Sequence, residues 1–303
     1  MTTPTQSTLF GGPVDVFETA LSRYGIWPMS VWPVDHQDKL TKQLKRAIGD
    51  DPNELDGKSR HGSRGPNSGA GQFPGSAQSA RQSHDSPEKT HTSVFNPAVA
   101  AWLLNCYAPE TGVCIDPFAG GGTRAIMAAK HGLQYTGLEL RQEEVDAVNE
   151  RCRRVGVGND VRIICGDARG IGDFGPGNFL LTCPPYYDLE MYEGGAADLS
   201  MASSYAQFLV GINEVIEGTY RALLPGSYSC WVVGLHRSRD GGLLPLNHDI
   251  ARLHREAGFM FREEIILHQI GNGAIQRVGT FEKGRHLLVR IHEYALVFWK
   301  PTA

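Results

Sequence analysis

The chain has 303 residues, enough for one large domain or two small ones. Hydrophobic residues make up 41% of it and charged residues 20%, and the formal net charge is −4. This composition is that of a globular protein. It excludes a disordered chain, a small disulfide-stapled protein and a broadly basic nucleic-acid coat, but it leaves room for a local basic patch.

No run of about 18 apolar residues exists, so we predict no membrane span. The first ten residues lack the basic and then apolar pattern of a secretory signal, and we therefore expect a cytoplasmic protein. The six cysteines form no CxxC pair and the histidines show no metal-binding spacing. We predict reduced thiols and no structural metal.

Residues 1–56 form an N-terminal extension with a short apolar stretch, two Trp-Pro pairs and a basic helix predicted over 39–48. Proline disfavours helix in the residue before it, so the apolar stretch is expected to be extended. Residues 57–91 are rich in Gly, Ser, Pro and Gln and contain almost no large apolar residue. Such a segment cannot bury enough surface to offset its ordering entropy, and we predict that it is flexible.

From residue 92 to the end, strand-like apolar runs alternate with helix-like periodic ones. We expect strands at 113–118, 135–140, 161–165, 179–183, 228–235, 261–267 and 287–298. We expect helices at 123–130, 141–155, 204–224 and 246–257. This alternation predicts one α/β domain over 92–303, with a mostly parallel seven-stranded sheet and helices on both faces. Ligands bind such sheets at the carboxyl ends of the strands.

The first candidate site is the glycine-rich turn at residues 116–123, which joins the first strand of this domain to a helix. Glycines let a ligand approach the backbone, and the helix start offers free N–H groups. The turn lacks a Walker lysine and a clean GxGxxG spacing. Carboxylates at the ends of the next two strands could accept bonds from ribose hydroxyls and from an adenine amine. This set suits a nucleoside without phosphates, and S-adenosylmethionine fits it. The candidate cofactor-binding residues here are Asp116, Pro117, Phe118, Gly120, Gly122, Thr123, Glu139 and Asp167.

The second candidate site is the sequence Thr-Cys-Pro-Pro-Tyr-Tyr at residues 182–187, after the fourth strand. Two prolines fix the backbone, so that carbonyls can point into a pocket as acceptors. Methylation of an exocyclic amine needs such acceptors, because that nitrogen is a poor nucleophile and must be positioned. We predict catalytic roles for Cys183, Pro184, Pro185 and Tyr186, with the ring of Tyr186 stacked on the base. Tyr187 either walls the pocket or packs in the core.

Together the two motifs resemble those of the S-adenosylmethionine-dependent amino-methyltransferases of DNA, which act on adenine N6 or cytosine N4. The stretch 183–192 and the terminal run 292–298 look more narrowly like DNA methylases of phages and prophages. The resemblance implies a Rossmann-like class I methyltransferase fold. It also implies that the segment 92–97, with Phe95 and Asn96, contacts the methionine part of the cofactor.

The chain departs from the pattern of that family at Cys183, where Asp, Asn or Ser normally binds the target amine. Sulfur is a weak acceptor, so either Thr182 or a backbone oxygen compensates, or activity is low. Serine to cysteine is the smallest change, which favours cytosine N4 slightly; adenine N6 stays open. A C5-cytosine mechanism uses a Pro-Cys nucleophile. The order here is Cys-Pro, which disfavours that mechanism.

A base inside a duplex must be flipped out to meet the cofactor, which requires phosphate contacts on either side. For nucleic-acid binding we select Tyr187, Arg237, Arg277, Lys283 and Arg285, with target-recognition loops at about 187–203 and 269–286. The arginines of the cluster at 151–154 are expected to face solvent at a helix end. DNA is the expected partner, with a homodimer as an option. The alternatives are an RNA guanine-N2 methyltransferase and a catalytically weak, DNA-associated cofactor-binding module.

Overall fold

The computed structural model describes residues 29–36, 38–49, 95–187, 195–238, 241–270 and 288–302. Its strands are β1 (Val31–Asp35), β2 (Val113–Asp116), β3 (Gln134–Glu139), β4 (Val161–Cys165), β5 (Gly177–Thr182), β6 (Leu223–Val233), β7 (His236–Arg237), β8 (Leu243–Leu244), β9 (Met260–Ile270) and β10 (His292–Trp299). Its α-helices are α2 (Lys39–Ala47), α4 (Pro97–Tyr107), α5 (Thr123–His131), α6 (Gln142–Arg154), α7 (Tyr205–Ala222) and α8 (Leu246–Glu256). Short 3-10 helices are η1 (Ala168–Phe174), η3 (Gly195–Ala197) and η4 (Leu199–Met201).

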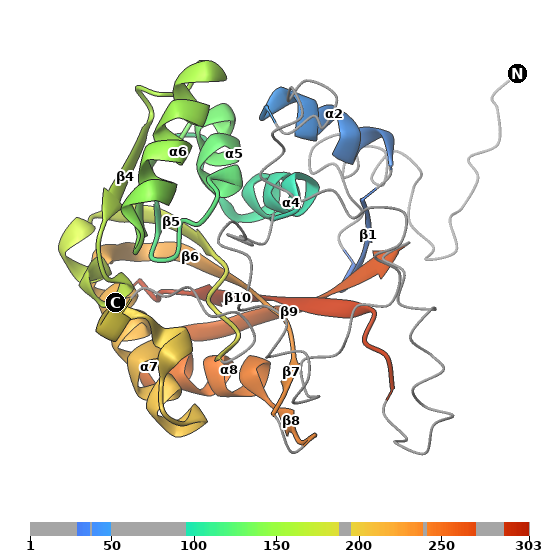
Figure 1. Cartoon of the computed structure of the whole chain (residues 1–303), viewed down its shortest axis with the longest axis vertical. Coiled ribbons are helices and arrows are strands. Elements are labelled where there is room, and N and C mark those ends of the chain that lie inside the picture. The colour runs from blue at the N-terminus through green and yellow to red at the C-terminus, as the bar shows by residue number, and fades with distance from the viewer. Residues whose placement is uncertain are drawn as a thin grey trace, which may run out of the picture.

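The main sheet has the strand order β1-β9-β10-β6-β5-β2-β3-β4. Neighbouring strands run parallel, except that β10 is antiparallel to both β6 and β9. Helices α4, α5 and α6 cover one face, and α7 and α8 cover the other (Figure 1). This is the Rossmann-like class I methyltransferase fold, so the predicted fold class is confirmed.

The sheet has eight strands rather than the seven expected, because β1 pairs in parallel with β9 at its edge. Pro33 lies within β1, and an edge strand tolerates a residue that cannot donate a ladder hydrogen bond. The side chain of Trp32 is buried and meets Trp102 of α4 edge to face, with ring centroids 5.9 Å apart. Trp32 and Val34 therefore share one core with helices α4 and α5, which follow the segment 57–91 in the chain.

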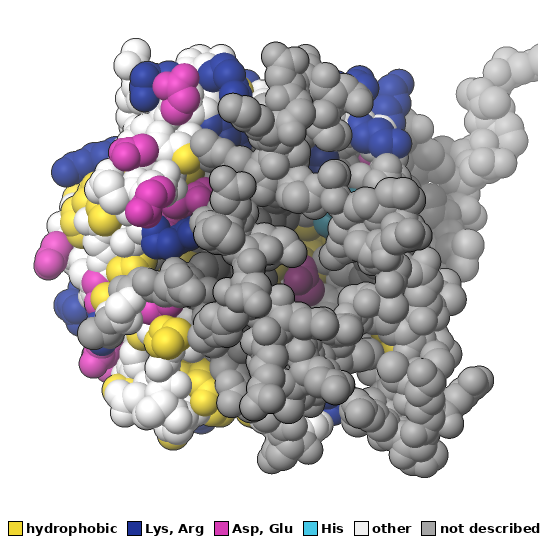
Figure 2. Space-filling model, in the orientation of Figure 1, with side chains coloured by type: hydrophobic (Ala, Val, Ile, Leu, Met, Phe, Trp, Pro, Cys, Tyr) yellow, Lys and Arg dark blue, Asp and Glu magenta, His cyan; other side chains and the backbone are white. Residues whose placement is uncertain are grey.

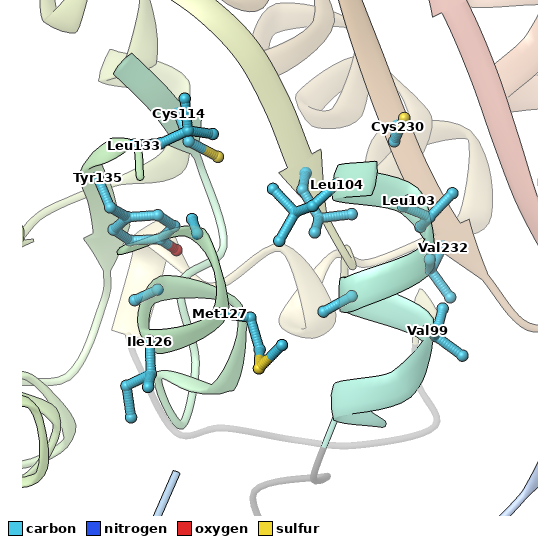
Figure 3. Close-up of a cluster of buried hydrophobic side chains, with 14 of the residues drawn as sticks. Val99, Leu103, Leu104, Cys114, Ile126, Met127, Leu133, Tyr135, Cys230 and Val232 are labelled. Atoms are coloured by element: carbon cyan, nitrogen blue, oxygen red, sulfur yellow. The ribbon is translucent and has the colours of Figure 1, made fainter. Parts of the chain in front are cut away.

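The larger part of the core lies between the sheet and α4 and α5. Figure 3 shows Leu103 and Leu104 of α4 beside Val232 of β6, with Met127 of α5 and Tyr135 of β3 further along the same layer. The sequence analysis did not single out α4. Most of this helix is buried, so apolar and polar residues do not alternate there with a clear helical period. None of the helices in the described residues is both long and apolar enough to cross a bilayer.

Several polar residues meet at the carboxyl edge of the sheet. Asp116, Glu139 and Thr182 are the last residues of β2, β3 and β5. Because β10 runs antiparallel to its neighbours, its first residues, His292 and Glu293, lie at the same edge. The topology thus brings together residues that are up to about 180 positions apart in the chain, and it puts both candidate motifs at one edge.

The side chain of Trp32 tests whether β1 is an integral part of the fold. Trp32→Ala is expected to lower the free energy of unfolding by about 3–5 kcal/mol, because it leaves a large cavity against Trp102. Val31→Ala on the same strand is the control; Val31 is 46% exposed, and its truncation should change stability by less than about 0.5 kcal/mol. Urea unfolding measures both, and equal midpoints for the two variants would contradict the docking of β1.

Candidate active site

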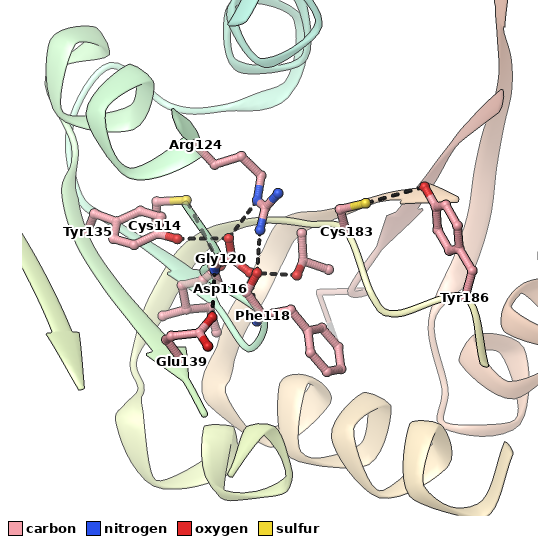
Figure 4. A network of polar contacts seen from close by, with 11 residues as sticks. Cys114, Asp116, Phe118, Gly120, Arg124, Tyr135, Glu139, Cys183 and Tyr186 are labelled. Atoms are coloured by element: carbon pink, nitrogen blue, oxygen red, sulfur yellow. Dashed lines mark hydrogen bonds and ion pairs between the residues drawn. The ribbon is translucent and has the colours of Figure 1, made fainter. Parts of the chain in front are cut away.

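The carboxylate of Asp116 is the most heavily bonded group in the region. It is fully buried, and its Oδ1 accepts hydrogen bonds from the Phe118 amide at 2.9 Å and the Thr182 hydroxyl at 2.5 Å. Its Oδ2 accepts from Arg124 Nε and from the Tyr135 hydroxyl, both at 2.7 Å (Figure 4). Four donors from four different segments therefore converge on one carboxylate.

This arrangement locates Asp116 beneath the glycine-rich turn rather than on its surface. Arg124 also donates to the carbonyl of Phe118, so the guanidinium joins Asp116 to the turn. Burial is the largest single effect on the pKa of Arg124 and would lower it, but the charge of Asp116, the hydrogen bond to Asp116 and the neighbouring Tyr135 together raise it. The pair is therefore a buried and hydrogen-bonded ion pair that holds the turn in one conformation.

The glycines of the turn have separate roles. Gly122 has φ +80°, and a Cβ there would lie 2.5 Å from Val148 Cγ1, so both conformation and packing require glycine. Gly120 has φ +52°, and the nearest atom to a Cβ there would be the Phe118 carbonyl oxygen at 3.8 Å. As far as the described residues go, the space beyond Gly120 is thus open to a ligand. Pro117 and Thr123 are buried at the two ends of the turn.

Glu139 lies beside this open space. Its Oε2 accepts the Gly120 amide at 3.1 Å, and its Oε1 accepts the Arg141 amide at 3.1 Å. Burial is the main cause that raises the pKa of Glu139, and the Arg141 amide opposes it. The Glu139 side chain is 12% exposed, so its oriented carboxylate can accept bonds from hydroxyl donors beside Gly120.

Asp167 follows β4 and caps η1. Its carboxylate accepts the Arg169 amide at 2.9 Å and pairs with the Arg169 guanidinium, with Nη2 to Oδ2 at 2.5 Å. Burial would raise the pKa of Asp167, but the hydrogen bonds from Arg169 lower it below its usual value. The side chain is 31% exposed, so it is accessible at the edge of the sheet, although much of its acceptor capacity is used by Arg169. Its contact with an adenine amine stays a prediction.

Phe95 and Asn96 lie next to the glycine-rich turn. The Phe95 ring has the Arg124 guanidinium 4.9 Å from its centroid. Asn96 is buried at the N-cap of α4, where its Oδ1 accepts the Ala98 amide at 2.8 Å, and its Nδ2 lies 3.4 Å from His36 Nδ1. Both residues are near the predicted cofactor region, and their role in binding stays a prediction.

The Cys-Pro-Pro-Tyr turn begins directly after the Thr182 that bonds to Asp116. Cys183 Sγ lies 3.4 Å from the Tyr186 hydroxyl, and Pro184 is buried. The ring of Tyr186 packs on Gly234, where a Cβ would come within 2.9 Å of Cε2. In Figure 4, Phe118 lies between Glu139 on one side and Cys183 and Tyr186 on the other. The two motifs are therefore neighbours at one edge, as their order on adjacent strands indicates.

Cys183 carries a protonated thiol at neutral pH. Burial raises the pKa of Cys183 to about 11, and the Arg124 charge and the hydrogen bond to Tyr186 oppose that rise. Thr182 is fully buried, and its hydroxyl donates to Asp116. The Thr182 hydroxyl and a backbone oxygen were the two acceptors expected to replace the weakly accepting sulfur of Cys183. Because the Thr182 hydroxyl is buried and bonded to Asp116, it does not bind a substrate amine.

Tyr187 has φ +58°, a left-handed conformation that is uncommon outside glycine. Its ring meets Phe208 at a centroid distance of 5.6 Å and Tyr205 at 5.7 Å. Tyr187 thus packs between the turn and α7, and its contact with nucleic acid stays a prediction.

Three residues that hold the site were missed by the sequence analysis. Arg124 and Tyr135 bond to Asp116, and Arg151 donates to the carbonyls of Gly121 at 2.6 Å and Ile48 at 2.9 Å. The prediction that the arginines near residue 151 all face solvent was wrong for Arg151, since it supports the glycine turn. A usable signal for Arg124 was a lone charge on the apolar side of α5, just after the glycines.

The structure describes only some of the other residues predicted to contact nucleic acid. Arg237 is half-buried in the β7–β8 hairpin, where its Nη1 donates to the Gly241 carbonyl at 3.1 Å. Burial is the main cause that lowers the pKa of Arg290, and the charge of Arg237 adds to it. Arg277, Lys283 and Arg285 lie outside the described residues, as do 188–194 and 271–286 of the predicted recognition loops and the segment 57–91.

A second polar chain crosses the sheet edge from β1 to β10. His36 Nε2 lies 2.9 Å from Gln269 Oε1, and Gln269 Nε2 donates to Glu293 Oε2 at 3.0 Å. The residues come from three different strand ends, and no expectation from the sequence connected them. Figure 2 shows an acidic side chain and hydrophobic atoms in a hollow on this face of the molecule. Within the described ranges, no cluster of three residues able to hold a metal ion is present.

Comparisons with known proteins find DNA methylases, over a part of the chain that includes the glycine-rich turn. A family model described as DNA methylase matches residues 18–150. The Type II methyltransferase M.ScaI of Streptomyces caespitosus is 37% identical over 76 residues, which is 25% of this chain and 24% of that protein. The orphan methyltransferase M.BamHII of Bacillus amyloliquefaciens is 35% identical over 63 residues, 21% of this chain and 24% of that protein.

The chain thus aligns with about a quarter of the length of these relatives. Among solved structures, the protein TTHA0409 of Thermus thermophilus, complexed with S-adenosyl-L-methionine, is 29% identical, with a TM-score of 0.35 over 46% of this chain and 54% of that one. TrmN of Thermus thermophilus is 19% identical, with a TM-score of 0.45 over 68% of this chain and 49% of that one. The predicted resemblance to DNA amino-methyltransferases is confirmed by the family match and the curated relatives.

Asp116 provides a test of the buried clamp. Asp116→Ala leaves Arg124 as an uncompensated buried charge, so we expect the free energy of unfolding to fall by about 3–5 kcal/mol. The control is Asp173→Ala, because Asp173 is exposed and should contribute less than about 0.5 kcal/mol. Chemical denaturation compares the two, and a change below about 1 kcal/mol for Asp116→Ala would contradict the clamp.

The thiol of Cys183 provides a pH test. Because the thiolate is the reactive form and the pKa of Cys183 is about 11, its alkylation by iodoacetamide should be slow at neutral pH and rise about tenfold per pH unit. Peptide mass spectrometry reads each cysteine separately, and the exposed Cys165 is the internal control for reagent access. Rapid alkylation of Cys183 at about pH 7, without that rise, would show that the thiol is not buried and neutral.

Proposed function

We propose that this protein transfers a methyl group from S-adenosylmethionine to the exocyclic amino group of a flipped-out base in DNA, at cytosine N4 or adenine N6. One observation carries the proposal: the hydrogen bond of Thr182 to Asp116. It fastens the Pro-Pro-Tyr turn to the glycine-rich turn, so a methyl donor at one and an amine at the other would be neighbours. The match of residues 18–150 to DNA methylases supports the same activity.

The residues present suit the cofactor. The side of Gly120 away from the protein is open, and the Glu139 carboxylate next to it is fixed by two amides. Glu139 would hold the ribose hydroxyls, and Phe118 would border the adenosine. When bound, S-adenosylmethionine supplies an electrophilic methyl group on a sulfonium. The turn has no Walker lysine, and the charge of Arg124 beneath it is paired with Asp116, which suits a ligand that carries no phosphate.

The base would lie on the other half of the edge. Tyr186 would stack on it, and backbone carbonyls of the Pro-Pro turn would accept an N–H of its amine. Stacking and positioning act before the methyl moves, so they raise the rate by holding the nitrogen close to the methyl carbon. Arg237 and Arg290, two half-buried cations, would contact phosphates beside the flipped nucleotide.

The proposal is tested by methyl transfer with a labelled donor to duplex DNA and to tRNA, followed by nucleoside mass spectrometry. Label in N4-methylcytosine or N6-methyladenine of DNA is the expected result, and the mass identifies the base. Tyr186→Ala should lower kcat about 10²-fold or more while S-adenosylhomocysteine still binds by calorimetry. Tyr228→Phe, an aromatic change remote from the turn, is the control.

The other outcomes separate the alternatives. Label in tRNA alone would indicate an RNA guanine-N2 methyltransferase. Binding of S-adenosylhomocysteine with no transfer to either nucleic acid would indicate a cofactor-binding module without activity. Absence of binding would contradict the assignment of the glycine turn itself.

A further inference from the structure

The amine of the target base needs an acceptor that the Cys-Pro-Pro-Tyr turn does not provide. The thiol of Cys183 is neutral and a weak acceptor, and the Thr182 hydroxyl is fully buried and bonded to Asp116. A backbone carbonyl of the turn can accept one N–H of an amine. The second N–H then needs an oxygen from another part of the edge. This requirement rests on the proposed function, methylation of an exocyclic amine.

Glu293 lies next to this turn in the fold. Tyr294 pairs with Val233 across the β10–β6 ladder, so Glu293, one residue earlier, is level with Gly234. Gly234 is the residue on which the Tyr186 ring packs. The antiparallel direction of β10 is what brings a residue more than 100 positions from Cys183 to the same edge.

The electrostatics of the turn agree with this placement. Burial is the main reason that the pKa values of Cys183 and Tyr186 are raised, and the charge of Glu293 adds to both rises. The Glu293 carboxylate therefore acts electrostatically on both the thiol and the phenol. These are the two side chains expected to touch the amine and the ring of the base.

The carboxylate of Glu293 is held in place through its Oε2. Gln269 donates to its Oε2 at 3.0 Å, and Gln269 is itself held by His36 at 2.9 Å. His36 in turn lies 3.4 Å from Asn96 Nδ2 at the start of α4. In the part of the chain that the structure describes, no hydrogen bond to Glu293 Oε1 is found. Glu293 is half-buried, and burial raises its pKa, so its carboxylate is more basic than an exposed one.

We propose that Glu293 supplies the acceptor for the target amine that aspartate, asparagine or serine would supply at the position of Cys183. Its Oε1 would accept one N–H, while a carbonyl of the Pro-Pro turn accepts the other, and the nitrogen lone pair is directed at the methyl group. As the N–C bond forms, the C–S bond of the donor breaks with its electron pair left on sulfur. The proton lost by the nitrogen passes to the Glu293 carboxylate and then to solvent.

The test is a double-mutant cycle between Glu293 and Cys183, measured as methyl transfer to DNA. Glu293→Met keeps the length of the side chain but has no acceptor, and we expect kcat to fall about 10²–10³-fold with little change in KM. Glu293→Gln retains an oxygen without the charge and should lose about tenfold. With Cys183→Ser as background, which restores an oxygen, Glu293→Met should lose less than about tenfold.

Two controls exclude a structural effect. Glu264→Gln changes an exposed carboxylate of β9 and should leave kcat unaltered. Calorimetry with S-adenosylhomocysteine and thermal melting should give wild-type values for each Glu293 variant, because the cofactor half of the edge is not changed. A structural role alone would lower stability and would cost the same factor in both backgrounds.

Each result decides between the two proposals. Wild-type kcat in Glu293→Met, or an equal loss with cysteine and with serine at position 183, overturns the role of Glu293 and leaves the methyltransferase proposal intact. Absence of transfer by the wild-type protein to DNA and tRNA overturns both. If transfer is to tRNA alone, the DNA proposal fails, and the same variants then decide the role of Glu293 toward the RNA amine.

Discussion

The interaction on which the site depends is the buried contact between Asp116 and its four donors. One carboxylate fixes the start of the glycine turn through the Phe118 amide, the first helix through Arg124, the next strand through Tyr135, and the neighbouring motif through Thr182. A buried carboxylate of this kind is tolerated only because a cation and three further donors satisfy it. Its function in the fold is to convert two separate loops into one rigid surface.

The edge built in this way has two chemically different halves. On the side of β2 and β3, glycines with positive φ and the Glu139 carboxylate leave an open space with oriented acceptors. On the side of β5, β6 and β10, prolines, a packed tyrosine and a second carboxylate form a more enclosed surface. The division matches the needs of a reaction in which a donor must be bound and a weak nucleophile must be oriented.

The N-terminal strand contributes to the second half rather than only to the sheet edge. β1 ends next to His36, which links Asn96 to Gln269 and through it to Glu293. A strand that arrives from a distant part of the sequence therefore orients a carboxylate on the last strand of the sheet. This link gives a physical reason why residues before the segment 57–91 belong with the site. Trp32 and Val34 anchor those residues in the core.

The sequence by itself determined the elements and the two motifs, because apolar periodicity, glycine and proline act over a few residues. It indicated β2, the Gly120 to Gly122 turn and the Cys-Pro-Pro-Tyr turn at nearly their observed bounds. Only the tertiary structure decided that Asp116 is a buried clamp, that Arg151 supports the turn, and that Glu293 lies level with the Gly234 on which Tyr186 packs. These facts depend on strand order and on partners dozens of residues away, and no local pattern of residues contains that information.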